Sequence, residues 1–222
     1  DWSSDVCSSD LLIVPSAPGG GTDIIGRIVA NKLAESLGQQ VVVDNRAGAG
    51  TIIGIEMAAK APPDGYTLLV VAASVTMSPS LYKLPFDPVR DLAPISLIST
   101  LPNLLLANPA FPAKTVPELV EVLKANPGKY DYGSGGVGSS QQLSMALLLH
   151  ATGTKLNHIP FSGGSGQLTM ALVGNTVPLG FDTMTTSITQ VRAGSLRALG
   201  ISSRERSPAA PEIPAIAEFV PG

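Results

Sequence analysis

Two apolar runs in this chain each end at a cluster of glycine and hydroxyl residues, and each cluster is followed by the pattern of an amphipathic helix. The first run covers residues 11–14 and leads into the loop 15–23, with the sequence PSAPGGGTD. The second covers 129–132 and leads into GSGGVGSS at 133–140. Glycine lets the backbone approach a ligand closely, and the free N–H groups of a helix start favour negative charge. The sequence therefore predicts two anion-binding loops, about a domain apart along the chain.

Length and composition are those of a folded protein with one large or two small domains. The chain has 222 residues, 44% of them hydrophobic, and its mean hydropathy is +0.29. Only 14% of the residues are charged and the net charge is -3, with no Lys/Arg-rich face, so we expect no nucleic-acid partner. No apolar run reaches the roughly 18 residues that a membrane span needs.

The N-terminal segment differs in character from the rest. Residues 1–11 read like a translated sequencing adapter joined to a truncated gene, and they hold the chain's one tryptophan and its one cysteine, Cys7. We exclude them from the fold prediction. Without Cys7 the chain has no cysteine for a disulfide framework or a zinc site. The absence of a leader therefore says nothing about localisation, because the adapter-like segment replaces the true start.

From residue 11 onward, short apolar runs alternate with helical patterns. Strands are predicted at 11–14, 41–43 and 66–72, with Thr51 as the cap of a helix between the last two. Further strands are predicted at 95–99 and 103–107, and strands and helices continue to alternate to the end of the chain. This order favours parallel sheets with helices on both faces. We place the change from a first lobe, 12–102, to a second lobe, 103–222, between the last two of these strands.

The second glycine cluster matches a dinucleotide-binding fingerprint, G-x-G-x-x-G, at Gly133, Gly135 and Gly138. That fingerprint also needs an acidic residue about 20 positions later, at the end of the next strand. The next predicted strand, 157–161, has the sequence NHIPF and ends without one. A cradle for a smaller anion fits better. A nucleotide- or cofactor-dependent α/β enzyme using the Gly133–Gly138 loop remains the alternative, as do glycines needed only for close packing.

Residues for catalysis are scarce. The chain has no G-x-S-x-G elbow, and neither His150 nor His158 has a partner at metal-ligand spacing. Asp23 is either a helix cap or a ligand contact. Asp182, at a predicted strand end, has the same two interpretations. Without paired acids for acid–base chemistry we expect no enzyme, no catalytic residue, no metal and no cofactor.

A carboxylate ligand has two kinds of candidate donor here. Four arginines could pair with it: Arg27, Arg46, Arg192 and Arg197, although the last two flank a glycine turn and fit surface charges better. Backbone N–H groups and hydroxyls are the other source. The hydroxyl candidates are Ser74, Thr76, Ser139, Ser140 and Thr183.

Six collinear motifs give the chain a family resemblance. They are IVPSAPGGGTD at 13–23, VDNRAGAG at 43–50, PDGYTL at 63–68, LYKLPFD at 81–87, ANPGK at 125–129 and RALG at 197–200. Together they resemble the substrate-binding receptors of tripartite tricarboxylate transporters, the Bug-type periplasmic proteins. The similarity runs from residue 12 to the end of the chain.

The resemblance implies an α/β, two-lobed periplasmic-binding-protein fold of the type II, flytrap kind. It implies a monomeric periplasmic receptor that closes on a small organic carboxylate and delivers it to membrane permease subunits. It also implies a cleaved export signal upstream of this fragment, and a chain truncated at the C-terminus, since the family has a further segment that returns to complete the first lobe.

The resemblance also implies a set of ligand contacts, in the two glycine loops and at three positions outside them. Gln142, Phe161 and Thr183 stand where the family usually has histidine, tyrosine and asparagine, so a changed ligand specificity is expected and citrate is not assumed. The implied contacts are Pro18, Gly19, Gly20, Gly21, Thr22, Asp23, Ser74, Gly138, Ser139, Ser140, Gln142, Phe161 and Asp182.

Overall fold

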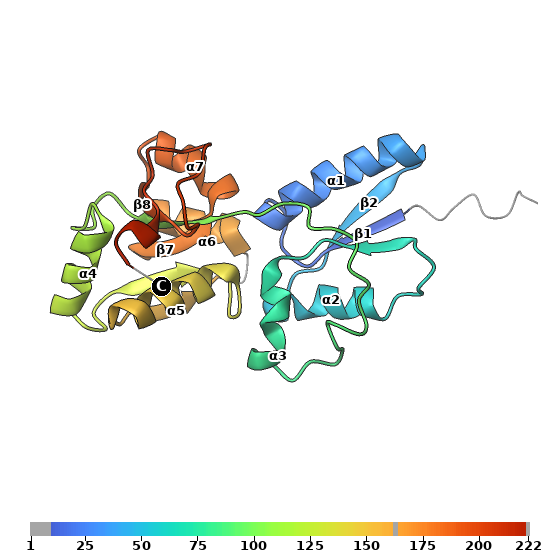
Figure 1. Cartoon of the computed structure of the whole chain (residues 1–222), viewed down its shortest axis with the longest axis horizontal. Helices are drawn as coiled ribbons and strands as arrows, with labels where there is room; N and C mark the ends of the chain where they lie inside the picture. Colours follow the sequence, from blue (N-terminus) through green and yellow to red (C-terminus); the bar gives the residue numbers. More distant parts are fainter. Residues whose placement is uncertain (1–9, 162–163, 221–222) are drawn as a thin grey trace, which may run out of the picture. The chain divides into compact units, whose positions relative to one another are not determined.

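The computed structural model describes residues 10–161 and 164–220, which fall into two compact units that divide between Ser96 and Leu97 (Figure 1). Most of the predicted adapter segment, residues 1–9, lies outside the described residues. Asp10 and Leu11 belong to the first strand, where they pair with Val41 and Val42. Gln39 Nε2 donates to Asp10 Oδ2 over 2.8 Å, so this carboxylate is held inside the first unit.

The first unit is a small parallel sheet with helices. Its strand order is β2-β1-β3, with β1 paired in parallel to both neighbours. The helix α1 crosses from β1 to β2, and Leu12, Ala30, Val41 and Val70 form the core between helix and sheet. The elements are β1 (Asp10–Val14), α1 (Gly21–Leu37), β2 (Val41–Asn45), the 3₁₀ turn η1 (Ala49–Thr51), α2 (Ile52–Ala59), β3 (Thr67–Leu69), η2 (Ala73–Thr76) and α3 (Ser78–Leu81).

Two predictions for this unit need correction. The third strand is shorter than the predicted 66–72, because only Thr67–Leu69 pairs with β1. Thr51 does not cap the helix α2 with its side chain: its φ is +83°, and its hydroxyl makes no capping bond. The first turn of α2 is reached instead through a loop with several left-handed residues.

The second unit has a five-stranded sheet in the order β6-β5-β7-β4-β8. The predicted parallel pairing holds for only part of this sheet. The strand β5 pairs in parallel with both β6 and β7, whereas β4 runs antiparallel to both β7 and β8. The elements are β4 (Asn103–Ala107), α4 (Val116–Ala125), β5 (Asp131–Ser134), α5 (Ser140–Thr152), β6 (Asn157–Pro160), α6 (Gly164–Val173), β7 (Leu179–Thr183), α7 (Met184–Arg192), β8 (Arg197–Ile201) and η3 (Ile216–Glu218).

The strand predicted at 95–99 is absent from the described structure. These residues are coil, and Ile95 and Leu97 are 82% and 80% exposed. They lie where one unit ends and the other begins. An apolar run becomes a strand only where a neighbour can take up its backbone hydrogen bonds, and neither sheet provides one at this point.

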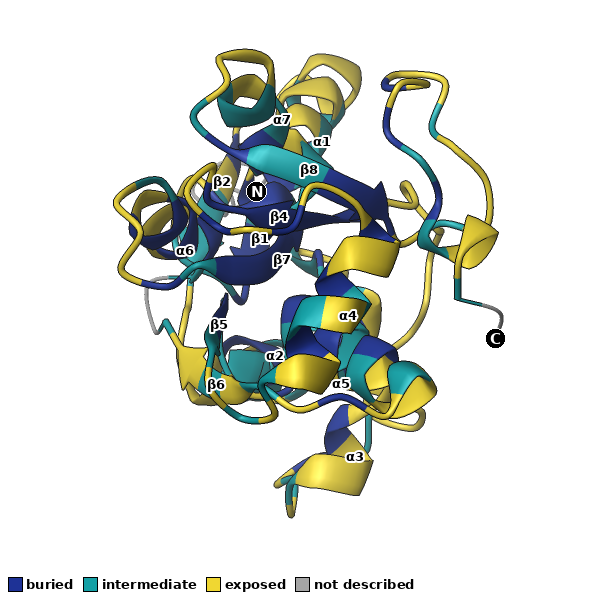
Figure 2. Ribbon diagram, turned by 90° about the vertical axis from the view of Figure 1, so that its left-hand side faces the viewer, coloured by how far each residue is buried: buried dark blue, intermediate teal, exposed yellow. Residues whose placement is uncertain are grey.

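Helices cover both faces of the second sheet, and β4, which has a strand on each side, shows it most clearly. All five residues of β4 are buried (Figure 2). Successive side chains of a strand point to opposite faces of its sheet. Leu105 packs in a core with residues of α4 and α5. Leu104 and Leu106 pack in a second core with residues of α6. This unit therefore holds its β-strand ends rigidly, which is what a binding loop at such an end requires.

Gly54 is a test of how tightly the first loop is packed. A Cβ at Gly54 would lie 2.7 Å from Pro15 Cβ and 2.8 Å from the Arg46 carbonyl oxygen, and neither atom can rotate away. We expect Gly54→Ala to lower the free energy of unfolding of the first unit by about 1–3 kcal/mol, the usual cost of overpacking. Hydrogen exchange of peptides from each unit, measured by mass spectrometry, separates the two units.

Gly166, in α6, provides the matched control. It is also a helical glycine, but a Cβ there meets nothing within 4 Å. Gly166→Ala should leave the second unit unchanged or stabilise it by up to about 1 kcal/mol, since alanine is the better helix former. Equal effects of the two substitutions on the free energy of unfolding would show that close packing against Pro15 does not cause the loss at Gly54.

Candidate functional site

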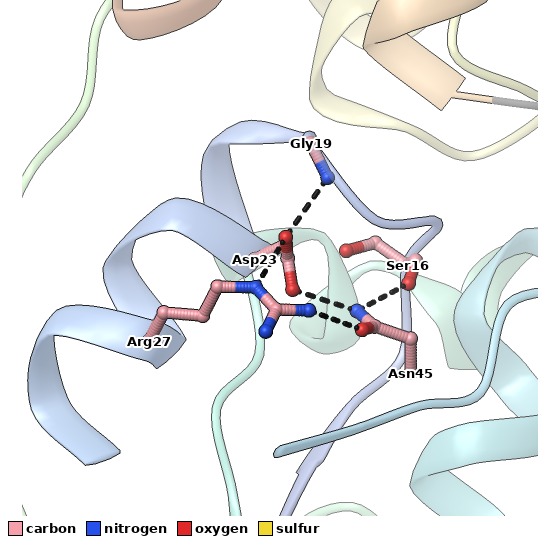
Figure 3. A network of polar contacts seen from close by, with 5 residues as sticks. All are labelled: Ser16, Gly19, Asp23, Arg27 and Asn45. Atoms are coloured by element: carbon pink, nitrogen blue, oxygen red, sulfur yellow. Dashed lines mark hydrogen bonds and ion pairs between the residues drawn. The ribbon is translucent and has the colours of Figure 1, made fainter. Parts of the chain in front are cut away.

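The first glycine loop turns β1 into α1 through a left-handed glycine. Gly19 has a φ of +81°, a conformation that glycine adopts without the steric cost of a Cβ. Its N–H donates to Asp23 Oδ2 over 2.8 Å (Figure 3). Because α1 begins at Gly21, Asp23 is the third residue of the helix. Its side chain therefore reaches back and fixes the loop, and it does not accept the first-turn N–H that the cap prediction assigned to it.

The Asp23 carboxylate is itself held by two further side chains. Arg27 Nε donates to Oδ2 over 3.0 Å, and Asn45 Nδ2 donates to Oδ1 over 2.9 Å (Figure 3). Asn45 Nδ2 also donates to the Ser16 carbonyl, at the start of the loop. Burial alone would raise the pKa of Asp23, but the hydrogen bonds from Arg27, Gly19 and Asn45 outweigh it and hold the pKa below its ordinary value. Asp23 is thus a buried, charged anchor of the loop.

The second loop repeats this geometry with a neutral acceptor. Gly138 has a φ of +78°, and its N–H donates to Gln142 Oε1 over 2.6 Å. Gln142 is the third residue of α5, as Asp23 is of α1. Ser139 caps the helix, since its Oγ accepts from the Gln142 N–H over 3.3 Å and donates to the Gly136 carbonyl over 2.7 Å.

His158 holds Gln142 in place from the neighbouring strand. It lies on β6, where it pairs in register with Tyr132 of β5. His158 Nδ1 lies 3.3 Å from Gln142 Nε2, and Nε2 lies 2.6 Å from Ser134 Oγ. The Tyr132 ring stacks on the imidazole with centroids 4.9 Å apart. Burial lowers the pKa of His158.

Each loop therefore uses the same three parts: a left-handed glycine, a side chain at the third helix position that accepts from it, and a residue on the next parallel strand. Asn45 and His158 are those outer residues. A helix start leaves its first N–H groups without intrahelical acceptors. Among the described residues nothing accepts from the N–H groups of Gly21 and Thr22 in α1 or of Ser140 in α5. These donors, with the positive ends of two helix dipoles, are suited to an anion.

The structure divides the predicted site residues by role. The N–H groups of Gly19 and Gly138 are used inside their own loops. Pro18 and Gly19 are exposed at the loop, whereas Gly20 is buried at the helix cap. Ser74 is buried in η2 and its carbonyl accepts from Ser78 Oγ.

Phe161 and Asp182 both turn toward the interior of the second unit. Phe161 packs against the core that contains Leu168. Asp182 is fully buried, with Thr169 Oγ1 donating to its Oδ2 over 2.6 Å and the Thr183 N–H to its Oδ1 over 2.8 Å. Desolvation raises the pKa of Asp182 despite these bonds and those of Ser165 and Thr186.

The arginines suggested by the sequence are engaged within their own units. Arg27 binds Asp23 and Asn45, and Arg46 pairs with Asp44 over 2.8 Å. Arg192 donates to the Ala209 carbonyl. Arg197 donates to the backbone carbonyls of Pro109, Phe111 and Ala113. Main-chain N–H groups and hydroxyls remain the donors at the two loops.

The dinucleotide fingerprint loses its structural basis at its first glycine. Gly133 lies inside β5 and not in the turn that follows it. A Cβ there would lie 2.4 Å from Leu168 Cδ1 and 3.0 Å from Val177 Cγ2, so the core leaves no room for a side chain. Gly133 is therefore explained by the last of the interpretations given for this motif, a glycine needed only for close packing.

Sequence reasoning missed the residues that hold the loops from a distance. Asn45 and His158 are separated from their partners by 22 and 16 residues, and only the pairing of parallel strands brings them there. A polar residue on the strand after each glycine loop was the available signal. Ser16 Oγ and Thr51 Oγ1 were also missed; both are buried without a hydrogen-bond partner in the described structure.

The described residues show neither a cluster of metal ligands nor a candidate membrane-spanning helix. No three His, Cys, Asp or Glu side chains come together there as metal ligands. No helix among them has both the length and the apolar character that a bilayer crossing requires.

Two α/β units, each with a glycine loop at the start of a helix, define the class of two-lobed solute-binding proteins, and solved structures agree. The chain is similar to a Rhodopseudomonas palustris protein, Rpa4515, solved with adipate: 32% identity, TM-score 0.92, covering 100% of this chain and 74% of that one. It is similar to MatC of the same organism, solved with malate, at 30% identity and a TM-score of 0.86, covering 96% and 72%. The periplasmic binding protein BugD gives 34% identity and a TM-score of 0.85, covering 94% and 70%.

The family follows from the sequence comparisons. The model of the tripartite tricarboxylate transporter family receptor matches residues 25–221, and the chain belongs to this family. BugT of Bordetella pertussis is 39% identical over 211 residues, which cover 94% of this chain and 64% of BugT. A protein of Pseudomonas sp. strain P51 is 40% identical over 207 residues, which cover 93% and 61%. The chain thus spans less than two thirds of these relatives. The family is one of periplasmic solute receptors, and the resemblance seen in the motifs is confirmed.

Asp23 and Asp182 are both buried, and their stability contributions should respond differently to loss of the carboxylate charge. The lowered pKa of Asp23 means that its contribution to stability is present above the ordinary value of 3.8 and is lost as the pH falls through its folded-state pKa. We expect Asp23→Asn to lower the free energy of unfolding at pH 7 by about 2 kcal/mol, the scale of hydrogen bonds to a charged group. Urea unfolding followed by circular dichroism measures it.

Asp182→Asn is the comparison variant. The folded state binds a proton at Asp182 more readily than the unfolded state does, so stability falls as the pH rises above 3.8 through the raised pKa. A neutral amide removes that loss. Asp182→Asn should therefore cost less at pH 7 than Asp23→Asn and should flatten the pH dependence of stability above pH 4. A larger loss for Asp182→Asn would contradict this assignment.

Proposed function

We propose that this chain is the ligand-binding part of a periplasmic receptor that binds a small organic carboxylate and delivers it to membrane permease subunits of a tripartite transporter. It binds its ligand without turnover, as a monomer, and uses no nucleic acid, metal or cofactor. The observation that carries the proposal is the pair of matching helix starts, one in each unit, with main-chain N–H groups of Gly21, Thr22 and Ser140 lacking acceptors among the described residues.

The ligand class is supported by both the geometry and the relatives. A carboxylate accepts hydrogen bonds from such N–H groups and gains from the helix dipoles. Rpa4515 and MatC, with identities of 32% and 30%, were solved with adipate and malate, two dicarboxylates. One carboxylate group for each loop is the simplest use of two such sites.

The ligand sites we propose remain those predicted from the sequence, with Gly19, Asp23, Gly138 and Gln142 shaping the loops. We add two hydroxyls of the first unit: Ser16, in the first glycine loop, and Thr51, at the start of α2. A buried hydroxyl without a partner is costly, and a ligand oxygen or a bridging water would satisfy it.

Isothermal titration calorimetry with a panel of dicarboxylates and tricarboxylates tests the proposal directly. We expect saturable binding of at least one member by this chain, with Rpa4515 and adipate as the positive control for the assay. NMR spectra of the ligand after prolonged incubation should show no product. Thermal stabilisation by NAD or ATP, with none by carboxylates, would instead support the alternative of a nucleotide- or cofactor-dependent enzyme.

Aspartate substitutions at the two helix starts should separate binding from folding. Thr22→Asp and Ser140→Asp each place a negative charge in a first turn, where the helix dipole tolerates it. The same charge repels a bound carboxylate, so we expect each variant to bind at least about tenfold more weakly, as a loss of 1.4 kcal/mol implies. Calorimetry gives the affinity and thermal unfolding gives the stability.

The neutral variants Thr22→Asn and Ser140→Asn are the matched controls, since asparagine has nearly the same shape. They should bind within about threefold of the unsubstituted chain. If only one of the two aspartate variants lost affinity, the ligand would be held by one loop and not by both.

A further inference from the structure

The orientation of the Gln142 amide follows from a backbone donor that cannot rotate. Because the Gly138 N–H donates to Oε1, the Nε2 of the same amide faces His158. An amide Nε2 is a donor only, so His158 Nδ1 must accept. The proton of the neutral imidazole is then on Nε2.

This tautomer completes a chain in which every donor meets an acceptor. His158 Nε2–H donates to Ser134 Oγ over 2.6 Å, and the Gly136 N–H donates to the same oxygen over 3.2 Å. The Ser134 hydroxyl donates its own hydrogen to the Gly136 carbonyl over 3.1 Å. Both ends of the loop, Gly136 and Gly138, are thus connected to one imidazole.

Protonation of His158 would break this chain at Gln142. The imidazolium donates from both nitrogens, so Nδ1–H would point at the amide NH₂ of Gln142. Rotating the amide would restore that contact but turn the NH₂ toward the Gly138 N–H. One hydrogen bond is lost in either arrangement. The hydrogen bonds of the first loop have no such pH dependence, since the corresponding residue there, Asn45, has a neutral amide side chain.

The surroundings of His158 offer no described carboxylate to stabilise the imidazolium. Tyr132 stacks on it and stays neutral, because burial raises its pKa further. Asp131 accepts a hydrogen bond from Asn157, and these two residues directly precede Tyr132 and His158 on their strands. Because successive side chains of a strand point to opposite faces, Asp131 lies on the other face of the sheet from His158. Asp182 is enclosed by hydroxyls. Lys155, before β6, is exposed. The helices α5 and α6 carry no Asp, Glu, Lys or Arg, and His150 lies at the far end of α5.

We propose that His158 is a positioning residue that shapes the second glycine loop through Gln142 and Ser134, and that its protonation weakens carboxylate binding by releasing Gly138. This inference rests on the proposed function for the binding step. The shaping of the loop is a property of the ligand-free chain.

The first test is therefore made without ligand. Nitrogen-15 NMR of the two histidines should show His158 neutral with its proton on Nε2, titrating below pH 6.5, together with a pH-dependent shift of the Gly138 amide at the same midpoint. Gln142→Glu supplies a carboxylate that can accept from both Gly138 N–H and Nδ1–H. It should move the His158 midpoint above 6.5. A proton on Nδ1 in the unsubstituted chain, or a Gly138 amide indifferent to the titration, would overturn the proposal.

The second test measures adipate affinity by calorimetry between pH 8 and pH 5.5. Loss of one hydrogen bond predicts about a three- to tenfold weakening on acidification. His158→Gln should bind more weakly at pH 8 and show a flat pH profile. His150→Gln removes the only other histidine of the sequence and should keep the unsubstituted profile. A purely structural role for His158 would change the affinity without flattening the profile.

The outcomes separate this inference from the proposed function. If neither adipate nor any other carboxylate binds at pH 8, the proposed function fails, and the NMR test still decides whether His158 positions the loop. If adipate binds more tightly at pH 5.5 in a manner that requires His158, the imidazolium attracts the ligand, and the proposed weakening is wrong.

Discussion

The hydrogen bond from a left-handed glycine to the third residue of the following helix is the constraint on which both loops depend. It joins Gly19 to Asp23 and Gly138 to Gln142, at φ values of +81° and +78°. With this bond made, the chain turns from strand to helix, and the first N–H groups of the helix are left without an intrahelical acceptor. Without it, the loop would have to satisfy its backbone in another way, and the donors would not share one direction.

The two loops satisfy this constraint with opposite electrostatics. Asp23 places a negative charge at the positive end of α1, which stabilises the helix but competes with an incoming anion. Arg27 offsets part of that charge. Gln142 is neutral, so the dipole of α5 remains uncompensated by any side chain of its first turn. In the proposed receptor, the helix dipole at the second loop would therefore attract a carboxylate more strongly than the dipole at the first loop.

Local patterns were sufficient to predict the order of strands, glycine loops and helices, because apolar periodicity and glycine act within a few residues. Predictions from these patterns failed where a segment far away in the sequence determines whether a strand forms and in which direction it pairs. The run at 95–99 has no strand beside it, and β4 runs antiparallel because of its neighbours β7 and β8. Asn45 and His158 owe their positions to parallel pairing of strands, which no spacing in the sequence expresses. The glycines and the helix-start hydroxyls were visible, whereas the side chains that hold them were not.

The loops also differ in how completely they are satisfied before a ligand arrives. Around the second loop, Ser134, Gln142 and His158 all have partners. In the first unit, Ser16 Oγ and Thr51 Oγ1 are buried without one in the described structure, and Thr51 has a φ of +83°, which is costly for a β-branched residue. Such strain persists only where the surrounding structure enforces it. The first unit therefore keeps two buried hydroxyls without a partner in the described structure, whereas the polar side chains around the second loop are paired.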